Sequence, residues 1–597
     1  MKCKSTIVLR DPYVEWFSSG NRERGGPCLY MRGYATIDGR YLEGQDLVDC
    51  VQEKCSEGNT GPDVEVLKQL IPSIDGSWAL AVQWPNGRVL AATDRIRSIP
   101  LFYAMTSEAF VLGAAIEDVQ ERLHLYEVDT NAALEFLMVN YVTGDATLFK
   151  GVCQIQSGEL VEFNPDDTDM QFCRTRYYRF FPREYSHAPE TELEEEFESI
   201  LEGIFSRFVE GNGGRKVIVP LGGGWDSRLI VAMLRKQGMD DVLCFSYGPP
   251  GDEESLISKE VTEALGYEWR FIEYDQDMWA RWMASREMRD YWQYGCKGTS
   301  LPHLQDFPAV MSIMEDLSCS GGPIFFPGHS TGMPAGCHIS EDYTDWQRRG
   351  ATFPVAREIL RYHYKWYIES WSGHGQALSF LLNKINRLSA CPYGECGPNP
   401  VARFEMWDAE GRQALYIVNS VRVYEFAGVR WRIQWDYPLM DFFLKVPLEY
   451  RFKKRLYINT LQNRIFTGPA EKLAHIEVIS DTPPRPAPKL PPLRTAAKTA
   501  VKRSLAFLGL LNIVRNLYLE RESHPLLFES WFAGGLDPGN LTVAQALRKF
   551  GVLDNLPSDI FWAVKPLLTR RLDAVEPLHV LSLVVLGELC ARGDFNG

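Results

Sequence analysis

The chain has 597 residues, 45% of them hydrophobic and 24% charged, a composition typical of a globular protein in solution. This length exceeds what a single hydrophobic core accommodates, so two or three domains are expected. The formal net charge of -15 argues against a nucleic-acid partner, because binding phosphate backbones requires a basic surface.

The cysteines and the first residues indicate a cytoplasmic protein. Thirteen cysteines are scattered along the chain, without the paired spacing and flanking histidines of a zinc site, so reduced thiols are expected. The opening MKCKSTIVLRDPYVEW has no apolar core of signal-peptide length. No later apolar run reaches the length of a membrane span, so no transmembrane segment is expected.

The N-terminal part, residues 1–185, is predicted to be rich in sheet. Short segments such as GRVLAATD, AFVLGAA and GELVEFNP are bounded by Gly, Pro or Asp, as strands usually are. Residues 190–478 differ: an acidic helix is followed by strand and helix in alternation and then by mostly helical sequence, which favours a parallel sheet.

The most informative stretch is VIVPLGGGWDSRLIVAML, residues 217–234. Its first apolar run, Val217 to Val219, predicts a buried parallel strand, and the run from Leu229 to Leu234 predicts a helix. A glycine-rich turn between them leaves unpaired backbone N–H groups where the helix dipole favours an anion. The pattern predicts a phosphate site; a tight turn with an Asp-Ser cap is the alternative.

Two common phosphate loops are excluded. The Walker loop needs Lys followed by Ser or Thr after its last glycine, and the dinucleotide fingerprint spreads its glycines over a longer turn. What remains is a carboxylate, Asp226, suited to hold Mg²⁺, and a hydroxyl, Ser227, suited to contact phosphate oxygens.

The C-terminal part begins with a proline-dense stretch, residues 479–495, which predicts an extended linker, and residues 496–597 are expected to form a helical extension. Within residues 494–521, Lys498, Lys502 and Arg503 alternate with apolar residues at helical spacing. Such a helix either contacts an anionic membrane surface peripherally or packs on its own domain.

The succession VLCFSYGPPGDEESLISKEVTEALGYEWRFIEYD (242–275) after the glycine loop resembles the nucleotide-binding half of the asparagine synthetase family, whose loop reads Ser-Gly-Gly-x-Asp-Ser. Gly222 stands at the serine position, and Gly223, Gly224, Asp226 and Ser227 match. Residues 74–104 and 141–163 are similar to the glutaminase-type domain of that family. Residues 419–461 resemble its helical part, especially in the relatives found in polysaccharide and natural-product gene clusters.

This resemblance implies an α/β multidomain fold: an N-terminal α+β four-layer domain of the Ntn glutaminase type, then a parallel-sheet adenine nucleotide α-hydrolase-like domain (a PP-loop ATP pyrophosphatase) with a helical C-terminal part. It implies ATP and Mg²⁺ as cofactors. A substrate carboxylate would be activated as an acyl-AMP with release of pyrophosphate, and ammonia or an amine would displace AMP to form an amide. The small-molecule carboxylate and amine are not identified, and a homodimer is one option for the oligomeric state.

The resemblance also implies roles for single residues. Backbone amides of the glycine loop and the Ser227 hydroxyl would hold pyrophosphate, and Asp226 would hold magnesium. Lys454 would stabilise charge on the transferring phosphate, with Lys453 as its competitor. The remaining ATP-binding positions are Pro220, Leu221, Gly222, Gly223, Gly224, Tyr247, Gly248 and Gly328.

The second phosphate loop departs from the family pattern Ser-Gly-Glu-Gly-Ala-Asp-Glu. It aligns with PGHSTGM (327–333), which puts His329 at the glutamate and Gly332 at the metal-binding aspartate. Magnesium would keep fewer protein ligands, although waters and substrate phosphates can complete its shell. His329 either accepts a proton from the attacking amine or is a loop histidine without chemistry.

Glutamine hydrolysis is not expected. The family needs a free N-terminal cysteine, whereas here the first cysteine is Cys3, behind Lys2. The Arg-Gly-Pro-Asp motif is absent, and Asp38 stands where an Asn-Gly pair would form an oxyanion hole. The stretch WRIQWDY (431–437) lacks the family's proline near Asp436, which puts aspartate as the substrate in doubt. The alternative function is a non-catalytic ATP-binding or scaffold protein of the same fold.

Overall fold

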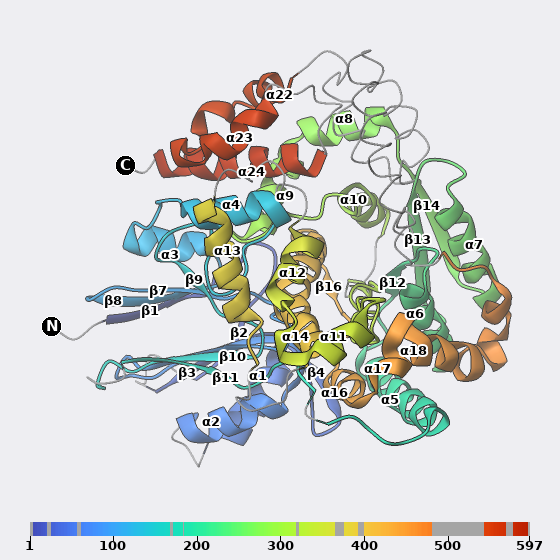
Figure 1. The fold of residues 1–597 in the computed structure, drawn as a ribbon. Helices are drawn as coiled ribbons and strands as arrows, with labels where there is room; N and C mark the ends of the chain where they lie inside the picture. The colour runs from blue at the N-terminus through green and yellow to red at the C-terminus, as the bar shows by residue number, and fades with distance from the viewer. Residues whose placement is uncertain are drawn as a thin grey trace, which may run out of the picture.

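The structure is a computed structural model that describes residues 4–20, 26–56, 61–167, 171–182, 184–317, 322–364, 375–391, 399–479, 542–568 and 577–594. Figure 1 shows sheets and helices stacked in layers in the N-terminal part, a separate parallel sheet with helices around it, and the C-terminal helices lying against the N-terminal part.

Two packed sheets form the N-terminal domain. The larger has the order β11-β10-β6-β5-β3-β2, with β4 added to β3, and every pair in it is antiparallel. The smaller has the order β1-β8-β7-β9, in which β1 and β8 run parallel. Their bounds are β1 Lys4–Val8, β2 Phe17–Ser19, β3 Cys28–Ile37, β4 Arg40–Glu43, β5 Asp75–Gln83, β6 Val89–Thr93, β7 Phe102–Met105, β8 Ala109–Gly113, β9 Cys153–Gln154, β10 Glu159–Phe163 and β11 Phe172–Arg176.

Helices cover both outer faces of this pair of sheets. Helices α1 (Gly44–Cys55) and α2 (Val64–Leu70) lie on the larger sheet, and α3 (Ile116–Leu123) and α4 (Thr130–Val139) lie on the smaller (Figure 1). The strands fit this sandwich because β5 and β6 are almost wholly buried, and their central residues are apolar. The domain therefore has the four layers that the sequence predicts.

The second sheet is parallel, with the order β14-β13-β12-β15-β16. Its strands are β12 Val217–Pro220, β13 Val242–Gly248, β14 Glu268–Glu273, β15 Ile324–Phe325 and β16 Arg430–Trp431. Helices α5 (Glu190–Gly211), α6 (Trp225–Lys236) and α7 (Glu253–Leu265) share a buried apolar cluster with it. The predicted fold class is confirmed: a domain of mainly antiparallel sheets precedes one built on a parallel sheet.

Most of the chain after β14 is helical, as the sequence predicts. The α-helices are α8 Gln276–Ala284, α9 Arg286–Cys296, α10 Phe307–Asp316, α11 Tyr343–Arg349, α12 Val355–His363, α13 Gly375–Leu388, α14 Pro400–Trp407, α15 Arg422–Phe426, α16 Tyr437–Lys445, α17 Leu448–Arg451 and α18 Arg455–Thr460. The segment 408–417 after α14 is wound as a π-helix, and residues 468–475 form a 3₁₀-helix.

Three C-terminal helices, α22 (Val543–Lys549), α23 (Phe561–Leu568) and α24 (Pro577–Asp594), pack beside α4 and α9. Ser582 of α24 donates a hydrogen bond of 2.8 Å to the side chain of Asn140. Within the described parts of the chain, no helix is long and apolar enough to cross a membrane. The predicted linker, apart from Ile479, and the predicted membrane-contact segment 494–521 lie outside the described residues.

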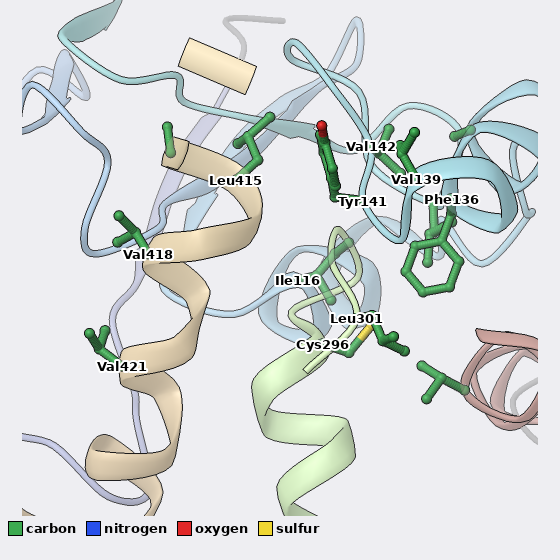
Figure 2. Packing of buried hydrophobic residues seen from close by; sticks show 14 of the residues in the cluster. Ile116, Phe136, Val139, Tyr141, Val142, Cys296, Leu301, Leu415, Val418 and Val421 are labelled. Carbon is green, nitrogen blue, oxygen red and sulfur yellow. The ribbon is translucent and has the colours of Figure 1, made fainter. Parts of the chain in front are cut away.

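One apolar cluster joins the two halves of the protein. Figure 2 shows Ile116, Tyr141, Cys296, Leu301 and Leu415, which come from segments far apart in the sequence and pack in one interior. The rings of Tyr141 and Tyr416 stack at 5.5 Å. Because this core is shared, packing alone draws no line between the halves, and the predicted boundaries at 185–190 and 478–479 stay proposals.

Candidate functional site

The candidate site lies where the carboxyl ends of β12, β13 and β15 meet, the usual ligand edge of a parallel sheet. The predicted strand and helix around the glycine loop are confirmed by β12 and α6. Gly224 caps α6 with extended backbone, and no side chain occupies the cap position. The first N–H groups of α6 are thus free of a side-chain cap and available to an anion.

A cavity of about 240 Å³ opens at this edge. Predicted site residues form much of its wall: Pro220, Leu221, Gly222, Gly224, Asp226, Ser227, Tyr247, Gly328 and His329. Three predicted residues, Gly223, Gly248 and Lys454, are not in the wall. Six further wall residues were not predicted: Trp225, Phe245, Ser246, Asp252, Glu254 and Asp306.

The carboxylate of Asp226 is held by donors from three parts of the chain. Tyr457 donates its hydroxyl to Oδ1 at 3.0 Å, and Nζ of Lys454 lies 3.8 Å from the same oxygen. The backbone N–H of Gly332 donates to Oδ2 at 2.9 Å. Both oxygens of Asp226 are therefore already engaged by the protein.

The structure separates the two candidate lysines. Lys454 is buried, with 6% of its side chain exposed, and faces Asp226. Lys453 is 60% exposed and forms a salt bridge of 3.1 Å with Glu341. Both residues have a left-handed backbone, with φ of 56° and 57°, and this double turn points the neighbouring side chains in different directions. Lys454 is the one placed to serve the site.

The second loop adds no carboxylate beside Asp226. Position 332, where the resemblance expects a second carboxylate, supplies an N–H group that already occupies Asp226. A Cβ atom at Gly332 would lie 2.9 Å from Oδ2 of Asp226. Among the described residues, no group of three or more His, Cys, Asp or Glu side chains is arranged to hold a metal. Magnesium is commonly held by one or two protein carboxylates and completes its octahedral shell with waters and substrate phosphates, so Asp226 would have to supply the protein's share.

His329 reaches the cavity from the second loop, and its Nδ1 lies 2.7 Å from the hydroxyl of Ser420. Burial lowers the pKa of His329 against the opposing effect of the Asp306 carboxylate, so the ring is neutral at pH 7. In the tautomer in which Nδ1–H donates to the Ser420 hydroxyl, Nε2 is the acceptor nitrogen of the neutral ring.

Tyr247 forms part of an aromatic and acidic wall. Its ring stacks on Tyr274 at 4.8 Å, and its hydroxyl donates to the Asp306 carboxylate. Asp306 is only 5% exposed. Two oxygens in the wall have no protein partner, the buried hydroxyl of Ser246 and Oδ1 of Asp252, whose other oxygen caps α7 by accepting the Ser255 N–H. Polar atoms left unpaired in a cavity are the natural partners of a ligand.

The absence of side chains at two glycines brings the two loops together. A Cβ at Gly328 would lie 2.7 Å from the backbone nitrogen of Ser227, so a larger residue would push the second loop off the first. A Cβ at Gly222, where the resemblance expects serine, would lie 3.1 Å from the Glu254 carboxylate. Gly248 ends β13 with a φ of 150° and accepts the Tyr274 N–H at 2.9 Å.

Arg228, immediately after the loop, was not predicted to matter. It is fully buried and donates to the carbonyls of Ile476 (2.9 Å) and Glu477 (2.6 Å). Ile479 in turn donates its N–H to the Gly223 carbonyl at 3.1 Å. We call residues 476–479 the C-terminal strap, since they lie across the glycine loop.

The wall residues that sequence reasoning missed left weak signals. Asp252 stands three residues before Ser255 in a helix-cap pattern, and Asp306 directly precedes Phe307-Pro308 at the start of α10. Both patterns predict helix ends and say nothing about a pocket. Nothing in the sequence pointed to Tyr457 or Ile479.

Comparison with known families finds a match in the N-terminal domain. Residues 62–178 match the family described as glutamine amidotransferase domain. No curated protein matches the chain. This part of the chain therefore carries a glutamine amidotransferase domain, which agrees with the predicted glutaminase-type fold and covers a minority of the sequence.

Two solved structures share remote similarity. The NH3-dependent NAD synthetase from Campylobacter jejuni, in complex with nitrate ion, is 11% identical, with 34% of this chain and 94% of that chain covered and a TM-score of 0.19. The glutamine-dependent NAD+ synthetase from Acinetobacter baumannii, in complex with ADP, is 13% identical, with 44% and 61% covered and a TM-score of 0.18. Scores this low carry no argument about this chain, and the match to the amidotransferase domain is the one that bears on its family.

Proposed function

We propose that the protein is an ATP-dependent, AMP-forming carbon–nitrogen ligase of the asparagine synthetase type. The observation that carries this proposal is the cavity at the carboxyl edge of the parallel sheet. The glycine loop, the second loop with His329, and Tyr247 meet in its wall, and Lys454 is buried behind Asp226. Sequence motifs that are far apart in the chain thus converge on one pocket beside a helix N-terminus.

In this proposal a substrate carboxylate oxygen attacks the α-phosphorus of ATP, and pyrophosphate leaves. Pro220, Leu221 and the Tyr247 ring bind the adenine, and the amides after Gly222 with the Ser227 hydroxyl bind phosphate oxygens. Lys454, whose Nζ lies 3.8 Å from Asp226, stabilises negative charge on the transferring group. Adenylation matters because a carboxylate has no stable leaving group of its own.

The second step is attack of an amine nitrogen on the acyl carbon, with AMP as the leaving group. The attacking nitrogen must lose a proton, and His329 is a neutral base in the wall. With Nδ1 of His329 engaged by Ser420, Nε2 is the nitrogen that accepts this proton. The nitrogen source is free ammonia or an amine of the substrate, because the Arg-Gly-Pro-Asp motif of glutamine binding is absent from the sequence and Asp38 replaces the Asn-Gly pair.

A second candidate is a non-catalytic nucleotide-binding protein of the same fold. The observation that favours this candidate concerns Asp226, the proposed metal ligand. Its two carboxylate oxygens are contacted by Tyr457, Lys454 and Gly332. In this candidate the pocket binds nucleotide and the binding is transmitted to a partner, with no turnover.

The test is release of pyrophosphate and AMP from ATP supplied with magnesium. The acceptors are aspartate with ammonium and then a small-molecule extract of the source cells. The ligase proposal expects acceptor-dependent pyrophosphate that disappears in Asp226→Ala. Asp240→Ala, which removes an 85% exposed carboxylate from the same domain, should retain activity. Nucleotide binding without product under any condition would favour the second candidate.

A further inference from the structure

The C-terminal strap covers one glycine of the loop that is proposed to bind pyrophosphate. The side chain of Ile479 lies 2.9–3.3 Å from the position that a Cβ of Gly223 would occupy, and its N–H is bonded to the Gly223 carbonyl. Gly222 and Gly224 line the cavity, whereas Gly223 between them is buried and does not. The strap therefore removes the middle glycine from the pocket wall.

Arg228 fastens the strap. Its guanidinium donates to Ile476 and Glu477 carbonyls of the strap, and weaker contacts of 3.5 Å reach the carbonyls of Leu473 and Gly223. The fully buried side chain of Arg228 thus links the strap to the glycine loop, although the two segments lie at least 245 residues apart in the sequence. The hydrogen bonds of Arg228 go to backbone carbonyls, and burial lowers its pKa to about 10 against the opposing effect of the Glu260 carboxylate. Moving the strap would leave these donors without acceptors unless another anionic or carbonyl oxygen replaced them.

The part of the pocket that stays open is small and acidic. Its volume of about 240 Å³ lies below the usual range for drug-sized ligands, roughly 300–1,000 Å³. Carboxylates of Asp226, Asp252, Glu254 and Asp306 line it. Each phosphate added to a ligand brings more negative charge towards these groups. The unpaired Ser246 hydroxyl and Asp252 oxygen suit the hydroxyl groups of a ribose.

We propose that the C-terminal strap and pyrophosphate are alternative occupants of the glycine loop, so that the strapped chain is a site for a nucleoside monophosphate and a triphosphate binds only when the strap leaves Gly223. This inference rests on the proposed nucleotide function of the pocket. In an AMP-forming reaction, the strapped arrangement corresponds to the state after pyrophosphate has left. The strap then holds AMP or acyl-AMP in the open part of the pocket and closes the phosphate side.

The test is calorimetric binding of AMP and ATP to the full chain, with and without magnesium. Wild type is expected to bind AMP at least roughly tenfold more tightly than ATP, a difference of about 1.4 kcal/mol. Ile479→Ala removes the covering side chain and should shift this ratio towards ATP by about the same factor. Val478→Ala changes the adjacent apolar strap residue, which is not among the atoms nearest Gly223, and should leave the ratio unchanged.

A second readout follows the strap itself. The amide of Ile479, bonded to Gly223, should exchange its hydrogen slowly in the free and AMP-bound chain and faster with saturating ATP or pyrophosphate. Arg228→Lys keeps the charge but loses the forked donor geometry, so it should raise this exchange rate without ligand.

The outcomes distinguish a failure of the strap inference from a failure of the proposed nucleotide function. If ATP binds wild type as tightly as AMP and Ile479→Ala changes nothing, the strap inference is overturned and the nucleotide function stands. If neither nucleotide binds, both the inference and the proposed function fail. Retained thermal unfolding profiles in the variants confirm that they are folded.

Discussion

Gly332 donates its backbone N–H to Oδ2 of Asp226 at 2.9 Å, at the position where the asparagine synthetase resemblance expects a second metal-binding carboxylate. Gly332 lacks the carboxylate expected there, so only its backbone donor faces Asp226 at this point. An Asp226 carboxylate that accepts from Gly332 and Tyr457 and lies beside Lys454 is neutralised by the protein itself. Any divalent ion in the reaction would have to arrive with the nucleotide's own phosphates.

Gly332→Asp tests this reading. The new Cβ would crowd Asp226, and two carboxylates so close would repel each other in the absence of a cation. We expect a lower melting temperature without divalent ions and a rise on adding magnesium that wild type does not show, measured by thermal unfolding. Gly375→Asp is the control, because a Cβ at Gly375 meets no atom within 4 Å. An equal magnesium effect in wild type would show that Asp226 already holds the ion.

Replacement of Lys454 by Met should affect stability and function together. Removing the buried ammonium leaves Asp226 with less compensation, at an expected cost of roughly 1–3 kcal/mol in the free energy of unfolding. Product formation, if the ligase proposal holds, should fall by about 100-fold or more. Lys453→Met is the matched control, since its exposed pair with Glu341 contributes about 1 kcal/mol at most. Denaturant unfolding and the pyrophosphate assay measure the two effects, and equal losses in both variants would remove the distinction between the lysines.

The glycine loop was predictable from sequence because its signals are local. A β-branched strand, three glycines and a breaker-free helix stand next to one another, and the structure has β12 and α6 there. The second loop followed from the resemblance, and its glycine and histidine do reach the pocket. The parallel sheet was predictable for the same reason, since strand and helix alternate along residues 217–273.

The partners of the loop were not predictable, because they come from distant parts of the chain. Tyr457 meets Asp226 across 231 residues, and Arg228 meets Glu477 across 249. Nor could the sequence separate Lys453 from Lys454, since the choice depends on two consecutive left-handed residues. Left-handed backbone at lysine has no strong local signal and is imposed by the surrounding packing.

The glutamine amidotransferase domain is expected to release no glutamate from glutamine, despite its family match. The reason lies in the absence of the Arg-Gly-Pro-Asp motif and in Asp38, which stands where the resemblance expects the Asn-Gly pair of an oxyanion hole. In a ligase assay with an active acceptor, ammonium should therefore support product formation and glutamine should not. Glutamate release by the purified chain that is lost in Cys3→Ala would contradict this expectation.

The buried histidine behind the site predicts how stability depends on pH. Burial, together with the neighbouring His329, lowers the pKa of His303 to about 4. The unfolded chain binds a proton near pH 6.5, where the native state does not, so stability should fall as the pH drops from about 6.5 to about 4. The shift corresponds to roughly 3 kcal/mol over this window.

His303→Asn should weaken this dependence of the unfolding free energy on pH, because an asparagine side chain does not titrate. Burial raises the pKa values of Asp75 and Asp94 to about 6, and these carboxyls act in the opposite direction, since their native forms bind protons more readily. The quantity to compare is therefore the slope of unfolding free energy against pH in wild type and variant, from denaturant titrations at pH 4 to 7. His124→Asn, at an exposed left-handed position, is the control and should keep the wild-type slope. A slope unchanged in His303→Asn would mean that the native state takes up this proton as readily as the unfolded chain, and that the ring next to His329 is not sealed from water.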